Sequence, residues 1–168
     1  MAMLLRTLLG HNEPGSELII GGSDPDLYEG ELTNLTVMPN SANYLMVSMP
    51  SLKFDGVEYC PNGCRAVLDT GTTNIGVPSS VIGKMMNTIV KKGACSRIPQ
   101  LPTIYLSLED TEFSLESEFY MNNNDGCGVG FYNSTAESDF WVLGTVFLQK
   151  YYTKYDLTQR IIGIAPAV

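Results

Sequence analysis

Residues 66–73 read Ala66-Val67-Leu68-Asp69-Thr70-Gly71-Thr72-Thr73, an apolar strand that runs directly into an aspartate. Charged side chains are rarely placed at the end of an apolar strand unless other groups hold them. The glycine two positions later lets the backbone turn sharply beside the carboxylate, and the threonines add hydroxyl donors. This pattern predicts an ionised, oriented carboxylate close to a substrate backbone. The Asp-Thr-Gly triplet occurs once in the chain.

The composition is that of a globular protein. The 168 residues are 44% hydrophobic and 17% charged, which predicts a single domain, residues 1–168, with a substantial core. We expect no membrane segment, because no apolar run reaches the roughly 20 residues of a membrane helix. A net charge of −8 and scattered Lys and Arg residues argue against nucleic acid as a partner. Residues 1–3 read as an added start, so we expect a piece of a longer protein.

The four cysteines predict two disulfides. Cys60 and Cys64 enclose a Pro-Asn-Gly turn that would bring their sulfur atoms together. Cys95 and Cys127 remain as the second pair, which is the simplest of the three possible pairings. Four reduced thiols are the alternative. A metal site is disfavoured, because the spacing is not Cys-x-x-Cys and His11 is the only histidine. We predict no metal and no cofactor, and disulfides would indicate an oxidising compartment.

Two triplets, Asn34-Leu35-Thr36 and Asn133-Ser134-Thr135, match the acceptor pattern for N-glycosylation. Both would accept glycans if the chain passes through the secretory route. Such triplets also arise by chance, so the alternative is that neither is modified.

Most of the chain reads as short strands separated by turn residues. The predicted strands are residues 17–20, 32–37, 44–49, 52–54, 57–59, 66–68, 104–108, 113–119, 141–143, 151–155 and 161–164. One short helix is predicted over 78–90: Pro78 suits a first turn, apolar residues recur at helical spacing from Val81 to Val90, and Gly93 follows as a stop. The fold class is therefore mainly β with one clear short helix.

Several segments, in order along residues 4–168, resemble the C-terminal lobe of the pepsin-like aspartic proteases, the family of pepsin, cathepsin D, renin and plasmepsins. Asp69-Thr70-Gly71-Thr72-Thr73 is similar to the second catalytic Asp-Thr-Gly-Thr-Ser of that family. The other matching segments are residues 16–24 with 28–32, the 60–64 cysteine loop, 98–104, 140–147 and 151–165. The resemblance implies one β-barrel-like lobe of a bilobal acid protease fold, with the N-terminal lobe absent from this chain.

The resemblance also implies a reaction, which is peptide-bond hydrolysis by a water held between two aspartates. Two adjacent carboxylates share a proton, so one acts as general base on the water while the other donates to the substrate carbonyl. Asp69 would be one member of this pair. The family's N-terminal lobe carries the other, so we expect this chain to be inactive alone and active with that lobe.

The resemblance assigns further roles around Asp69. Thr70 would hydrogen-bond into the other lobe, Gly71 would give the substrate access to the backbone, and Thr72 would bond the outer oxygen of Asp69. The loop that carries Asp69 would pass beneath Leu143-Gly144. Catalytic candidates are thus Asp69, Thr70, Gly71 and Thr72, and substrate-binding candidates are Gly71, Thr72, Thr73, Tyr44 and Val142.

Two other functions stay open. The chain is alternatively a catalytically silent lobe that grips extended peptides, or a homodimeric protease like the retroviral enzymes, with Asp69 contributed by two copies. The expected partners are the N-terminal lobe of the same protease, peptide or protein substrates, and pepstatin-type inhibitors. The expected location is the secretory route, whether extracellular, lysosomal or vacuolar.

Overall fold

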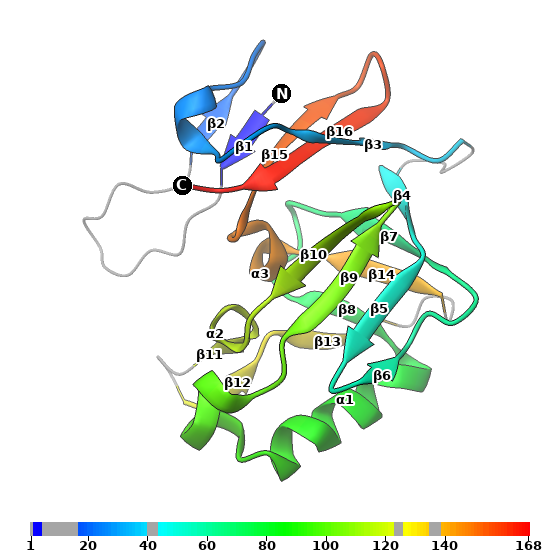
Figure 1. Ribbon diagram of the computed structural model, residues 1–168, viewed down its shortest axis with the longest axis vertical. Helices are drawn as coiled ribbons and strands as arrows, with labels where there is room; N and C mark the ends of the chain where they lie inside the picture. Colours follow the sequence, from blue (N-terminus) through cyan, green and yellow to red (C-terminus); the bar gives the residue numbers. More distant parts are fainter. Residues whose placement is uncertain (1, 5–16, 40–43, 123–125, 135–138) are drawn as a thin grey trace.

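The computed structural model describes residues 2–4, 17–39, 44–122, 126–134 and 139–168. The described strands form two five-stranded sheets, one four-stranded sheet and one two-stranded sheet (Figure 1). The prediction of a mainly β architecture is confirmed. Among the described residues, no helix has the length and apolar character that a membrane crossing requires. Met1, His11, Ser16 and Thr135, which the sequence analysis used, lie outside the described residues.

One five-stranded sheet carries the segment with Asp69. Its strand order is β13 (Phe131–Ser134), β8 (Ile75–Pro78), β14 (Phe140–Leu143), β7 (Cys64–Leu68) and β4 (Met46–Met49). Two neighbouring inner strands, β7 and β14, run parallel, with Leu68 opposite Leu143. Because parallel strands end at the same edge of a sheet, the residues that follow them, Asp69 and Gly144, become neighbours.

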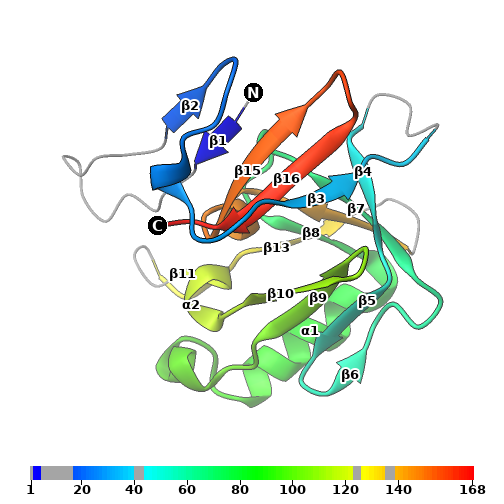
Figure 2. The ribbon, with the colours of Figure 1, turned by 45° about the horizontal axis from the view of Figure 1, so that its top comes forward.

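The second five-stranded sheet lies at the opposite end of the molecule from helix α1 (Ser79–Lys91), as Figures 1 and 2 show. Its order is β2 (Glu17–Ile19), β1 (Ala2–Leu4), β15 (Tyr151–Asp156), β16 (Ile161–Pro166) and β3 (Thr33–Thr36). The four-stranded sheet is β10 (Thr111–Leu115), β9 (Ile104–Leu108), β5 (Ser51–Phe54) and β6 (Val57–Glu58), and the small one pairs β11 (Met121–Asn122) with β12 (Gly128–Val129).

Asp55-Gly56, the two residues between the predicted strands 52–54 and 57–59, joins β5 to β6 in an antiparallel hairpin. Both turn residues have positive φ, 52° for Asp55 and 76° for Gly56. Two-residue hairpin turns of this hand favour an Asp-Gly sequence, because aspartate tolerates and glycine accepts positive φ.

The predicted helix is confirmed as α1, which runs from Ser79 to Lys91. It buries Val81, Met85 and Ile89, but Val90 is 66% exposed, so Val90 does not belong to the buried stripe. Gly93 follows with φ 104°, the left-handed conformation expected of a glycine stop. Two further α-helices of four residues each, α2 (Ser117–Tyr120) and α3 (Thr145–Leu148), were not predicted.

The predicted strand over 113–119 is wrong beyond Leu115, where β10 ends and α2 begins. Tertiary hydrogen bonds outweigh the alternating pattern here. The Ser117 hydroxyl donates to the Ile98 carbonyl, and the Tyr120 hydroxyl donates to the Pro102 carbonyl at 2.6 Å. Both contacts fix α2 against η2 (Ala94–Gln100) and the segment that follows it.

Both predicted disulfides are present. Cys60 is bonded to Cys64 and Cys95 to Cys127, with a Cα–Cα distance of 5.5 Å in each pair. The second bond closes a loop with a sequence separation of 32 residues and joins η2 to the segment before β12. Cross-links of this kind stabilise a fold by about 2–4 kcal/mol.

Candidate active site

Asp69 begins a loop that lies against the end of β14. The Asp69 N–H donates to the Leu143 carbonyl at 3.0 Å, and the Thr145 N–H donates to the Thr72 carbonyl at 2.8 Å. Gly144 lies between these two bonds and has φ −82°, which any residue adopts. A side chain there would nevertheless approach the carbonyl oxygens of Thr72 and Asn74 closer than 3.0 Å. The expected passage of the loop beside Leu143-Gly144 is therefore present, and it requires glycine for space.

The carboxylate of Asp69 is held through both of its oxygens. The Gly71 N–H donates to Oδ1 at 2.9 Å, and the Thr72 hydroxyl donates to Oδ2 at 2.7 Å. Hydrogen bonds to an ionised acceptor are stronger than neutral ones and fix its orientation. A Cβ at position 71 would lie 3.2 Å from Oδ1, so glycine also lets this backbone N–H come close. Asp69 keeps partial exposure to solvent.

A pocket of about 590 Å³ opens beside Asp69. It brings together Asp69 and two of the substrate-binding candidates, Tyr44 and Val142. Thr73 does not line it, and the Thr73 carbonyl instead accepts from the Thr145 hydroxyl at 3.1 Å. The full lining is Tyr44, Met46, Arg65, Val67, Asp69, Tyr132, Asn133, Ser134, Phe140 and Val142. Its walls are mostly apolar and aromatic, as in binding sites for apolar side chains.

Tyr132, which was not predicted from the sequence, lies on β13 and lines this pocket. Burial, together with the negative charge of Asp69, raises the pKa of its phenol. The ring lies over Gly76, where an added Cβ would come within 2.7 Å of the hydroxyl oxygen and 2.8 Å of Cζ. No local motif marks Tyr132, because it reaches the site only through the parallel pairing of β13 with β8.

A smaller pocket of about 330 Å³ lies on another side of Asp69 and is lined in part by Tyr44, Thr70, Tyr155 and Leu157. Thr70 is partly exposed here, and its role toward another lobe stays a prediction. Burial raises the pKa of Tyr155 to about 12, and the charge of Asp69 adds to this shift. Asp69 is thus flanked by hollows on two sides, with Tyr44 and Val67 lining both of them.

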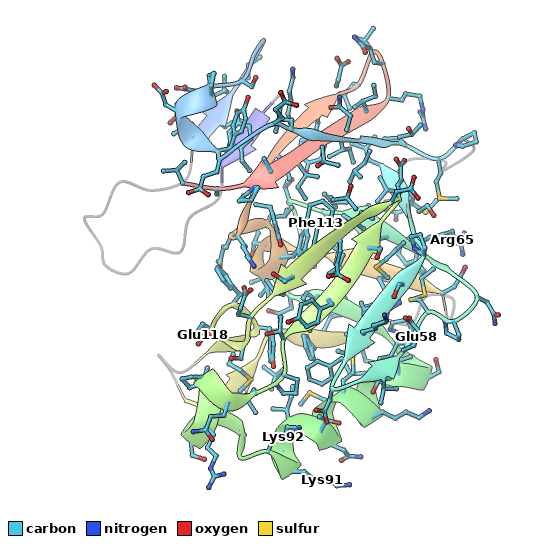
Figure 3. All side chains as sticks on the ribbon, viewed as in Figure 1. Glu58, Arg65, Lys91, Lys92, Phe113 and Glu118 are labelled. Atoms are coloured by element: carbon cyan, nitrogen blue, oxygen red, sulfur yellow. A yellow bond between two sulfur atoms is a disulfide. The ribbon has the colours of Figure 1, made fainter. Side chains whose placement is uncertain are left out.

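Arg65, one of the residues that line the 590 Å³ pocket, forms an ion pair with Asp139. Arg65, at the edge of the molecule in Figure 3, donates to Asp139 through Nε at 3.0 Å and Nη2 at 2.9 Å. The Arg65 backbone N–H also donates to the Asp139 carbonyl at 2.7 Å. The hydrogen bond from Arg65 lowers the pKa of the Asp139 carboxyl below its usual range. This pair fastens the start of β7 to the start of β14.

Replacing Asp139 by Asn is expected to lower the free energy of unfolding by about 0.2–1 kcal/mol near pH 6, the range for exposed ion pairs. Because the folded pKa of Asp139 is depressed, the pair stabilises the fold above the unfolded value of about 3.9. That stabilisation is lost as the pH falls through the folded pKa. Urea denaturation at several pH values measures how the free energy of unfolding differs between the unmutated chain and Asp139→Asn. Asp110→Asn, at an exposed position, is the control. A difference that persists at about pH 2 would contradict this account.

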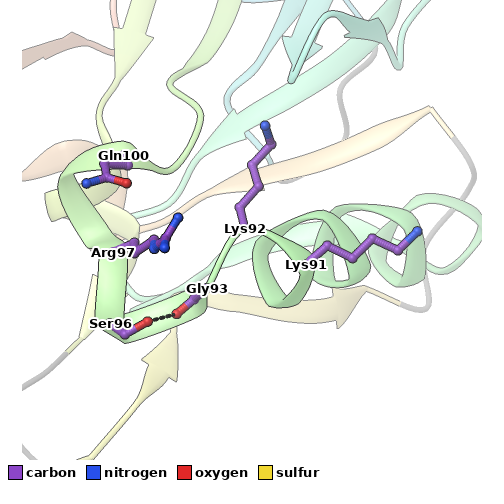
Figure 4. Close-up of a pocket in the computed structure, with 6 residues that line it drawn as sticks. All are labelled: Lys91, Lys92, Gly93, Ser96, Arg97 and Gln100. Atoms are coloured by element: carbon purple, nitrogen blue, oxygen red, sulfur yellow. Dashed lines mark hydrogen bonds between the residues drawn. The ribbon is translucent and has the colours of Figure 1, made fainter.

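A different hollow, of about 670 Å³, lies at the end of α1 (Figure 4). Its lining consists of Lys91, Lys92, Gly93, Ser96, Arg97 and Gln100. Lys92 pairs with Asp55 at 3.0 Å, and the Ser96 hydroxyl donates to the Gly93 carbonyl at 2.6 Å. The lining holds no carboxylate, so this hollow is not a candidate for acid–base chemistry by an aspartate. Among the described residues, no group of three or more His, Cys, Asp or Glu side chains is placed to hold a metal ion.

The comparisons with known proteins agree with this geometry. The family model described as eukaryotic aspartyl protease matches residues 4–167. The chain belongs to the eukaryotic aspartyl protease family. It is similar to pepsin A of Sus scrofa, with 30% identity over 95% of this chain and 44% of pepsin A.

Other relatives in the aspartyl protease family match to the same extent. Chymosin of Callithrix jacchus is 31% identical over 98% of this chain and 45% of chymosin. Pregnancy-associated glycoprotein 2 of Bos taurus is 33% identical over 95% of this chain and 45% of that protein. The chain therefore spans less than half the length of these relatives.

Proposed function

We propose that this chain is the C-terminal lobe of a pepsin-like aspartic endopeptidase and supplies one of its two catalytic aspartates. The observation that carries the proposal is the carboxylate of Asp69, bonded through both oxygens at the end of β7 and placed beside an apolar pocket. Simple structural roles for a carboxylate do not need an adjoining pocket. A reacting carboxylate needs both a fixed orientation and room for substrate.

In the proposed reaction Asp69 shares a proton and a water with a second aspartate. The ionised carboxylate of the pair takes a proton from the water, which attacks the substrate carbonyl while the protonated partner donates to the carbonyl oxygen. The donors from Gly71 and Thr72 keep Asp69 in one orientation through this exchange. The backbone of Gly71 is exposed and would be accessible to an extended substrate, and Thr70 would face the other lobe.

The second aspartate would come from the N-terminal lobe of the same protease. Two observations support this partner: the Asp-Thr-Gly triplet occurs once, and the chain spans 44–45% of its relatives. The proposed substrates are peptides with apolar residues at the cleavage site, since the pocket walls are mostly apolar. Pepstatin-type inhibitors would bind the same site. The two disulfides support a secretory location, whether extracellular, lysosomal or vacuolar.

Cleavage of an apolar-rich peptide between pH 3 and 6 tests the proposal. We expect no turnover from this chain alone, and pepstatin-sensitive turnover when it is joined to the N-terminal lobe of its own protease. Turnover by the chain alone that rises with the square of its concentration would mean a homodimeric protease instead. Peptide binding without turnover in the joined protein would mean a catalytically silent lobe.

A further inference from the structure

The acceptor asparagine of one glycosylation triplet lies at the candidate active site. Asn133 is an exposed residue of β13, an edge strand of its sheet, and it lines the pocket beside Asp69. Three successive residues, Tyr132, Asn133 and Ser134, form part of the same lining, so β13 passes along the pocket. The sequence completes the triplet with Thr135.

The amide of Asn133 is oriented by a hydrogen bond. The Ser79 hydroxyl, at the start of α1, lies 2.7 Å from Asn133 Oδ1 and 3.2 Å from the Ser134 carbonyl, and it donates to these oxygens. The bond from Ser79 reaches Oδ1 of the amide and does not use Nδ2, the atom to which a glycan is attached. A substituent on Nδ2 would leave the carbonyl oxygen and its bond from Ser79 intact. Because Asn133 is exposed, its modification is compatible with this contact.

We propose that Asn133 carries an N-linked glycan, and that this glycan covers part of the pocket beside Asp69 and limits which substrate side chains enter it. The inference rests on the secretory route in the proposed function. In the attachment step, Asn133 Nδ2 attacks the anomeric carbon of an oligosaccharide carried on a lipid pyrophosphate. A C–N bond replaces the C–O bond to the pyrophosphate, the amide loses a proton, and the lipid pyrophosphate leaves.

The second triplet supplies a matched control. Asn34 is also exposed and also lies on an edge strand, β3, but it belongs to the other five-stranded sheet and does not line the Asp69 pocket. A glycan on Asn34 would meet the same cellular requirements as one on Asn133. It would leave access to Asp69 unchanged.

Mass spectrometry of the chain secreted from eukaryotic cells tests the attachment. Thr135→Ala and Asn133→Gln each destroy the triplet, and Thr135→Ala keeps the Asn133 side chain in place. Both variants are expected to lose one glycan mass relative to the unmutated chain, whereas Asn34→Gln is expected to keep the glycan on the peptide that contains Asn133. An unmodified Asn133 in the secreted chain would overturn the proposal.

Nitration of tyrosines by tetranitromethane tests the covering of the pocket. Tyr132 is 36% exposed and lines the pocket, whereas Tyr105, 45% exposed on β9, lies outside it and serves as the internal control. Nitration of Tyr132 is expected to be several-fold slower in the glycosylated chain than in Thr135→Ala, with Tyr105 unchanged. Equal rates at Tyr132 would overturn the covering of the pocket. Neither measurement needs catalysis, so a chain without protease activity would still give a clear answer.

Discussion

Replacing Asp69 by Asn is expected to lower peptide hydrolysis by the joined two-lobe protein by at least about 10²–10⁴-fold, the usual contribution of an acid–base residue. An asparagine amide can neither take a proton from water nor give one to a carbonyl at working pH. The remaining aspartate of the other lobe would then lack the partner with which it shares a proton. The expected loss is in kcat, because the chemical step becomes slower. Peptide binding is expected to change much less.

The fold is expected to survive this substitution. The Gly71 N–H can still donate to the Oδ1 of an asparagine, at the 2.9 Å that it has in the structure. The Thr72 hydroxyl, which now donates to Oδ2 at 2.7 Å, can turn and accept from the new amide nitrogen. Exchange of a charged hydrogen bond for a neutral one costs about 1 kcal/mol.

The measurement is kcat and KM for one apolar-rich peptide, with Asp110→Asn as the matched control. Asp110 is exposed between β9 and β10, so its substitution makes the same change of charge away from the pocket. The control is expected to keep full activity. Substantial pepstatin-sensitive turnover in Asp69→Asn would mean that Asp69 does not take part in the chemistry.

Turns, loops and bonds that are determined by a few adjacent residues were predictable from the sequence. The turn at Asp55-Gly56 and the loop after Leu68 both follow from the preferences of a few adjacent residues. The spacing of Cys60 and Cys64 likewise predicted a bond that the structure contains. In each case the residues that decide the geometry lie within a few positions of one another.

Features that depend on which distant strands pair were not predictable from local residue preferences. Arg65 and Asp139 are 74 residues apart and meet only because β7 and β14 run parallel. Tyr132 reaches the pocket through the pairing of β13 with β8, and the Tyr120 hydroxyl helps to bend the chain after β10. Alternating patterns predict that strands exist. They do not specify which strands become neighbours.

Gly144→Ala is expected to destabilise the protein by about 1–3 kcal/mol or more, as for other added groups in a packed interior. The new methyl group would meet the carbonyl oxygens of Thr72 and Asn74 at less than 3.0 Å. These are backbone atoms, and the Thr72 carbonyl is held by the Thr145 N–H at 2.8 Å, so it cannot turn aside cheaply. Relief of the contact must move the loop that presents Thr72 to Asp69. Activity of the joined protein is therefore expected to fall together with stability.

Gly83→Ala separates this contact from the general effect of replacing glycine. Gly83 lies inside α1, and an added Cβ there meets no atom within 4 Å, so alanine is expected to stabilise the protein by up to about 1 kcal/mol. Urea denaturation measures the free energy of unfolding of both variants. The fluorescence of Trp141, which is the one tryptophan and is 1% exposed, follows the transition. A lower free energy of unfolding for Gly144→Ala together with a higher one for Gly83→Ala would show that the Asp69 loop is packed tightly against Gly144. A Gly144→Ala protein as stable as the original would mean that the loop can shift freely, and the fixed orientation of the Asp69 carboxylate would then need another source.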